Sequence, residues 1–120
     1  MQPPTPLRTR RVRYRSDVLV ISVTGEVDLS AEPALAEALD ADDARVLIVD
    51  LTNVAFLAVT GLRLLIAAND RAIAAGGGLG VVAHDRTALR LLRMGQAALP
   101  VFPSLSDAIR ELAGPAVVLT

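Results

Sequence analysis

The sequence contains no cysteine and no lysine, and its only aromatic residues are Tyr14, Phe56 and Phe102. Without cysteine the chain cannot form a disulfide framework, a thiolate metal site or a cysteine nucleophile. With so few aromatic side chains, a broad stacking surface for bases or sugars is not expected. The core must therefore be aliphatic, since alanine, leucine and valine dominate a hydrophobic content of 52%.

Long apolar runs are also missing. No stretch reaches the length that spans a bilayer, and Met1 to Pro6 lack the apolar segment of a secretory signal. We therefore expect a cytoplasmic protein with no membrane contact. The 120 residues suit one domain, which we place at 11–113 between flexible tails at 1–10 and 114–120.

All twelve basic residues are arginine, and five of them lie between Arg8 and Arg15. An N-terminal arm that grips nucleic acid is one interpretation of this cluster. The alternation of Arg11, Arg13 and Arg15 with Val12 and Tyr14 equally predicts an edge strand whose charged face deters pairing with other strands. We favour the edge strand and expect no nucleic-acid partner.

Periodicity predicts alternating strands and helices along the rest of the chain. A helix with Ser30 as N-cap buries a stripe that begins at Leu29, and it closes at a turn formed by Asp40, Asp42 and Asp43. The strands are expected at 11–15, 18–24, 45–51, 79–83 and 99–102, and further helices at 60–75, 85–94 and 104–112. This order requires right-handed crossovers, so we predict an α/β fold with a mostly parallel sheet of four to five strands, about four helices layered against it, and a hairpin at its first edge.

Few residues suggest catalysis. His84 is the only histidine, which excludes an ordinary metal site unless carboxylates complete it. Glu26 and Asp28 could share a strand face as an acid/base pair, although Asp28 is better explained as a partner for loop amides. An enzyme would require Asp28, Thr60, His84 and Asp85 to converge. We expect no enzymatic activity, no metal and no cofactor.

The glycine run at 76–78 does not have the context of a phosphate-binding loop. Such a loop follows a strand and opens a helix, whereas this run follows a predicted helix and opens a strand. Glycine at the left-handed position after a helix explains it better.

The segment from Asp50 to Leu62 carries an apolar loop, predicted at 52–59, to the start of a helix at Thr60. Thr60 could cap this helix. It could also accept a phosphate, which would meet free amides and the positive end of the helix dipole. Two added charges on an apolar surface would oppose burial of that surface against a partner.

Several motifs, in order and spacing, resemble the STAS domains of bacterial anti-sigma factor antagonists over Val18 to Leu112. They are Gly25-Glu26-Val27-Asp28 after a strand, Leu47 to Val54, Phe56-Leu57 with Gly61-Leu62, and Leu99 to Leu105. The resemblance implies the STAS fold and an antagonist that binds a kinase-type anti-sigma factor, releasing a sigma factor. ATP would belong to the partner, a serine-protein kinase.

The resemblance also implies a phosphorylation site, but the residues differ there. The family pattern Asp-Ser-Ser/Thr-Gly-Leu corresponds to Ala58 to Leu62, so the acceptor position is Val59 and the aspartate position is Ala58. Either Thr60 is a displaced acceptor, or the domain is not phosphorylated and is controlled by abundance or another input. We favour the second, because one residue of helix turns a side chain by about 100°.

The predicted partner-binding surface combines a turn, a loop and one helix flank. We expect the protein to act as a monomer or weak dimer. An alternative role is a STAS interaction or scaffold module in a complex without a sigma factor. The surface consists of Asp28, Ser30, Phe56, Leu57, Ala58, Val59, Thr60, Gly61, Arg63 and Ala67.

Overall fold

Two apolar strands, β2 (Val18–Val27) and β3 (Val46–Leu57), pair in parallel and form the centre of a five-stranded sheet. The computed structural model describes residues 6–40, 44–94 and 99–114. The strand order is β1-β2-β3-β4-β5, with β1 (Arg8–Arg15), β4 (Gly78–Val82) and β5 (Val101–Phe102). Only the β1–β2 pair is antiparallel, so the predicted hairpin edge and mostly parallel sheet are confirmed.

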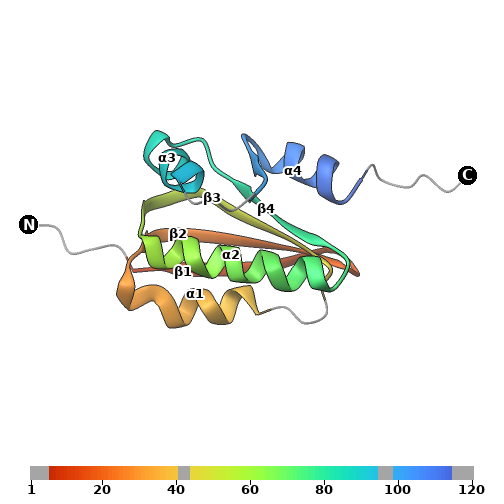
Figure 1. Cartoon of the computed structure of the whole chain (residues 1–120), viewed down its shortest axis with the longest axis horizontal. Coiled ribbons are helices and arrows are strands. Elements are labelled where there is room, and N and C mark those ends of the chain that lie inside the picture. Colours follow the sequence, from red (N-terminus) through yellow and green to blue (C-terminus); the bar gives the residue numbers. More distant parts are fainter. Residues whose placement is uncertain (1–5, 41–43, 95–98, 115–120) are drawn as a thin grey trace, which may run out of the picture.

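The central strands are apolar at consecutive positions because helices cover both of their faces. Leu19 and Ile21 point to a core shared with α1 (Glu32–Leu39), α2 (Val59–Ala74) and α3 (Arg86–Met94). Val18 and Val20 point to a smaller core under α4 (Leu105–Leu112). Figure 1 shows α1 and α2 side by side on one side of the sheet and α4 on the other.

Three predicted boundaries near the start of the domain were wrong. β1 begins at Arg8 rather than 11, because backbone pairing with Thr24 extends a strand whose side chains are exposed. β2 continues to Val27 rather than Thr24. Ser30 is not an N-cap: it lies inside a 3-10 turn, η1 (Leu29–Ala31), whose N-cap is Asp28, and α1 follows from Glu32.

The predicted loop at 52–59 was also wrong, since β3 continues as a strand to Leu57. β4 pairs with β3 only up to Asp50, so the second half of β3 is held by β2 alone. The register shifts twice there, and polar residues such as Thr52 and Asn53 face solvent. A half-exposed strand of this kind has no regular alternation to predict it.

The later boundaries agree more closely with prediction. α2 begins at Val59, one residue before the predicted start. Ser104 caps α4 as predicted, because its Oγ accepts from the N–H of Asp107 at 3.1 Å. The ends of both predicted tails, at 1–5 and 115–120, and the predicted turn residues Asp42 and Asp43 lie outside the described residues.

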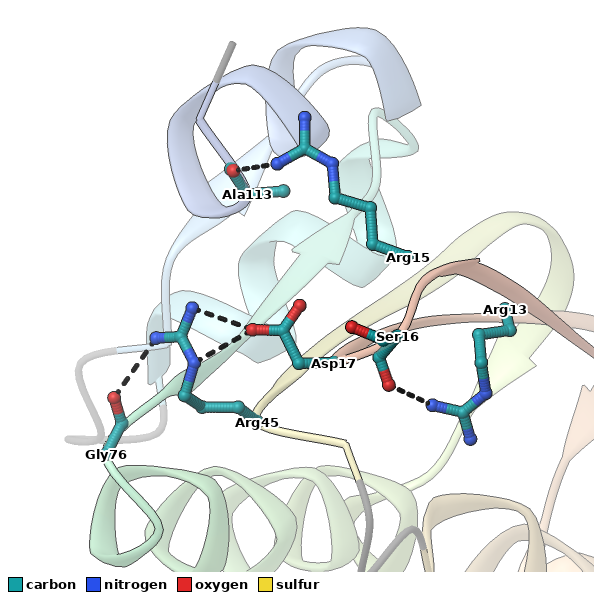
Figure 2. A network of polar contacts seen from close by, with 7 residues as sticks. All are labelled: Arg13, Arg15, Ser16, Asp17, Arg45, Gly76 and Ala113. Atoms are coloured by element: carbon teal, nitrogen blue, oxygen red, sulfur yellow. Dashed lines mark hydrogen bonds and ion pairs between the residues drawn. The ribbon is translucent and has the colours of Figure 1, made fainter. Parts of the chain in front are cut away.

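Arg45 joins three segments at the end of the sheet where β2 and β3 begin (Figure 2). Its guanidinium pairs with Asp17 Oδ2 at 3.0 and 3.1 Å and donates to the carbonyl of Gly76 at 3.3 Å. Both charged side chains are about half exposed, so the ion pair stabilises the fold by roughly 1 kcal/mol or less.

Three of the five arginines of β1 contact the domain itself. Arg11 donates to the carbonyl of Asp40 and Arg13 to that of Ser16. A bulge after Arg13 turns Arg15 toward α4, where it donates to the carbonyls of Ala113 and Gly114 at 2.7 and 3.3 Å (Figure 2). A cation there complements the C-terminal end of the helix dipole. These contacts support a structural role for the cluster, as an edge strand.

The glycine run ends α2 and starts β4, as predicted. Gly76 has a φ of 88°, the left-handed conformation, and Gly77 donates to the carbonyl of Ala72 at 2.8 Å. Gly77 also packs closely on the backbone of Arg45: a Cβ on Gly77 would lie 1.7 Å from the carbonyl oxygen of Arg45. A Cβ on Gly78 would meet nothing within 4 Å.

Gly77→Ala should therefore destabilise the domain by about 3 kcal/mol, since a backbone carbonyl cannot move aside as a flexible side chain can. Gly78→Ala is the matched control and should change stability by about 1 kcal/mol or less. Urea unfolding followed by circular dichroism measures both. Equal stabilities for the two variants would contradict this packing.

Candidate functional site

The carboxyl ends of β2 and β3 place two segments side by side. Val27 is the partner of Leu57 in the sheet, and the N–H of Ala58 donates to the carbonyl of Val27 at 2.8 Å. The turn at Asp28 and the start of α2 therefore leave the same end of the sheet, the arrangement expected from parallel strands.

Three large apolar side chains at this end are exposed: Leu29 at 68%, Phe56 at 51% and Val59 at 53%. We call these three residues the apolar tip. They come from η1, the end of β3 and the first turn of α2. Single exposed apolar side chains are ordinary on a protein surface, but three on segments that leave the same end of the sheet make this end a candidate contact site.

Leu29 is the residue of this tip that sequence reasoning placed wrongly. It was assigned to the buried stripe of the first helix, but η1 turns it outward and the stripe begins at Ala31. Asp28 is the residue that could have indicated this position. As an N-cap it starts the short turn η1 at Leu29, so Leu29 precedes α1 and does not lie in it.

The flank of α2 continues the exposed surface. Val59, Arg63 and Ala67 are spaced four residues apart and are all exposed, while Leu62 and Leu65 face the core. Two other predicted contact residues are not at the surface. Leu57 is 8% exposed and Gly61 is buried, so both support the tip from beneath.

Gly61 lets α2 approach the sheet. A Cβ at this position would lie 2.7 Å from Val27 Cγ1 and 2.8 Å from Leu57 Cδ1, and both of those side chains are buried. Close packing therefore favours glycine at this position, since a larger residue would force the first turn of α2 away from these two side chains.

Asp28 organises the turn beside the tip. Its Oδ1 accepts from the Ser30 hydroxyl at 2.6 Å and from the N–H of Ala31 at 3.1 Å. The Ser30 hydroxyl, which is the largest influence, together with nearby backbone N–H groups, lowers the pKa of Asp28 below its ordinary value, while slight desolvation opposes this. The contribution of this carboxylate to stability is lost only as the pH falls through that lowered pKa.

The Thr60 side chain does not cap α2. Its hydroxyl oxygen is buried and has no hydrogen-bond partner among the described residues, which costs roughly 1–3 kcal/mol. The N-cap of α2 is Ala58, and no side chain caps the helix. The interpretation of Thr60 as a helix cap was therefore wrong.

Two of the residues considered for catalysis, Asp28 and Asp85, accept hydrogen bonds from backbone N–H groups at the start of a turn or helix. Asp85 Oδ2 accepts from the N–H groups of Thr87 and Ala88 at the start of α3, much as Asp28 does at η1. His84 is exposed between β4 and α3. Among the described residues, no three side chains from histidine, aspartate or glutamate form a group that could hold a metal ion. The helices in the described part of the chain are all too short or too polar to span a membrane.

The chain belongs to the STAS domain family, whose model matches residues 9–108. The anti-sigma-F factor antagonist RsfB of Mycobacterium tuberculosis is 34% identical over 111 residues, which cover 88% of this chain and 90% of that protein. An anti-sigma factor antagonist from Mycobacterium paratuberculosis has a similar crystal structure, with a TM-score of 0.77 and 31% identity over 94% of this chain and 99% of the other. Unphosphorylated SpoIIAA, also an anti-sigma factor antagonist, superposes with a TM-score of 0.73 over 92% of this chain and all of its own, and at 16% identity it shows the fold alone.

Ala58 has the extended backbone of an N-cap residue, with φ −83° and ψ 165°, but it lacks an acceptor. Ala58→Asp should stabilise the domain by about 1 kcal/mol, because a carboxylate here can accept from a first-turn N–H. Ala58→Asn is the matched control for charge and should give a similar gain. Urea unfolding measures both, and no gain in either variant would contradict an uncapped α2.

Proposed function

We propose that this protein is a non-enzymatic anti-sigma factor antagonist, which binds a kinase-type anti-sigma factor through the apolar tip and thereby releases a sigma factor in the cytoplasm. The observation that carries the proposal is the exposure of Leu29, Phe56 and Val59 at one end of the sheet. The relative RsfB, an anti-sigma-F factor antagonist that matches 88% of this chain, supports the same role.

The proposed contact surface extends from the tip over the adjoining polar residues. Asp28 and Ser30 border it on the η1 side, and Arg63 and Ala67 extend it along α2. Ala58 and Ala67 are small, which allows a partner backbone to approach closely. The protein would act as a monomer or weak dimer, with the tip left open for its partner.

We also propose that phosphorylation does not switch this surface off. The family acceptor position is Val59, which has no hydroxyl, and the neighbouring Thr60 hydroxyl is buried. A kinase would have to unwind the first turn of α2 to reach it. Control by the amount of protein, or by another input, remains available to such an antagonist.

The binding proposal is tested by Val59→Glu, which places a charge at an exposed position of the tip. In a pull-down from extract of the native cell, the wild type should capture an anti-sigma kinase and the variant should lose it. Ile73→Glu is the matched control, because Ile73 is 58% exposed at the other end of the same helix. It should retain binding, and circular dichroism should be unchanged in both variants.

Two results would contradict the proposal. Retained capture by Val59→Glu would exclude the tip as the contact surface. Capture of other STAS proteins without any anti-sigma factor would favour the alternative role as a scaffold module.

The phosphorylation proposal is tested by incubation with the captured kinase and ATP, followed by intact mass measurement. The wild type should gain no phosphate. The double variant Ala58→Asp with Val59→Ser restores the family pattern and should gain one, which shows that the kinase is active. A phosphate on the wild type that is lost in Thr60→Ala would contradict the account.

A further inference from the structure

The outer face of α3 carries three arginines that the proposed function does not use. Ala88 and Leu92 anchor the helix in the core, at 8% and 3% exposure. Arg86, Arg90 and Arg93 follow one another at steps of four and three residues and are all exposed. At these steps their guanidinium groups stand on the same side of the helix.

These arginines line a hollow of about 410 Å³ together with Thr87 and Leu89. A second hollow of about 240 Å³ adjoins it, because Leu89 and Arg93 line both. The second hollow is more apolar: its lining includes Val101 and Phe102, which are half-buried, together with the exposed His84. A basic subsite therefore lies next to an apolar one.

No carboxylate in the described part of the chain pairs with any of the three arginines. Asp85, the nearest acid in the sequence, instead accepts from the N–H groups of Thr87 and Ala88. Residues 95–98, which follow α3, are uncharged in sequence. Like charges on one helix face repel one another, so this arrangement favours an anionic ligand from outside the chain.

We propose that α3 and β5 form a docking site for an acidic segment of a partner protein, in which two or more carboxylates lie beside one apolar side chain. Guanidinium groups bind carboxylates through paired, charge-assisted hydrogen bonds. The adjoining apolar hollow at Leu89 and Phe102 would take the apolar side chain, which a free anion does not have. The site shares no residue with the apolar tip, so this proposal does not rest on the proposed function.

The test is a selection from a random twelve-residue peptide library on the full-length protein, followed by affinity measurement for the enriched peptides. Enriched sequences should be rich in aspartate and glutamate around one apolar residue. Replacing Arg86, Arg90 and Arg93 with glutamine should weaken the binding of the enriched peptides by about tenfold or more, since each charge-assisted hydrogen bond that is lost lowers the affinity.

The matched control replaces Arg8, Arg10 and Arg71 with glutamine. It removes the same charge from exposed positions away from α3, and it should keep the affinity of the wild type. Val59→Glu should keep it too, which separates this site from the apolar tip. Unfolding curves confirm that each variant is folded.

Three outcomes would overturn the proposal. Enriched peptides without an excess of acids would show that the face does not select carboxylates. Equal weakening in both triple variants would show that only overall charge matters. Tight binding of a DNA duplex or of anionic lipid vesicles through the same three arginines, without any peptide binding, would assign the face to a different class of partner.

Discussion

The parallel pairing of β2 with β3 is the constraint on which the candidate site depends. It runs from Val18 and Val46 to Val27 and Leu57, and the Ala58 N–H closes it on the carbonyl of Val27. Since β4 pairs only with the first half of β3, this pairing alone positions the strand ends. It brings η1 and α2 together, and Gly61 then allows α2 to sit directly against the sheet.

The start of α2 is where this chain departs from the phosphorylation pattern that its resemblance to anti-sigma factor antagonists implies. In that pattern Ala58 and Val59 stand where an aspartate and a phosphate acceptor are expected, and with Ala58 as N-cap no side chain caps the helix. Val59 is exposed, whereas the hydroxyl oxygen of Thr60 is buried. Because one fold supports many functions, the role of the domain depends on these residues rather than on the sheet.

Sequence patterns predicted the parts of the fold that burial determines. The apolar run from Val46 to Val49 predicted a central strand, and the glycines at 76–78 predicted the end of a helix. The second half of β3 was missed because backbone pairing, and not burial, makes it a strand. The outward position of Leu29 depends on the 3-10 turn capped by Asp28, and the burial of the Thr60 hydroxyl depends on tertiary packing. Neither this turn nor this packing produces a periodic pattern of apolar residues in the sequence.

The most direct test of the account uses the absence of cysteine, because a single introduced cysteine can be labelled without competition. Val59→Cys and Ile73→Cys, each carrying a photo-crosslinker, would be irradiated in extract of the native cell, and the adducts identified by mass spectrometry. The account predicts an adduct with an anti-sigma factor through position 59 and none through position 73. An anti-sigma factor linked through 73 and not through 59 would contradict the assignment of the apolar tip as the contact surface.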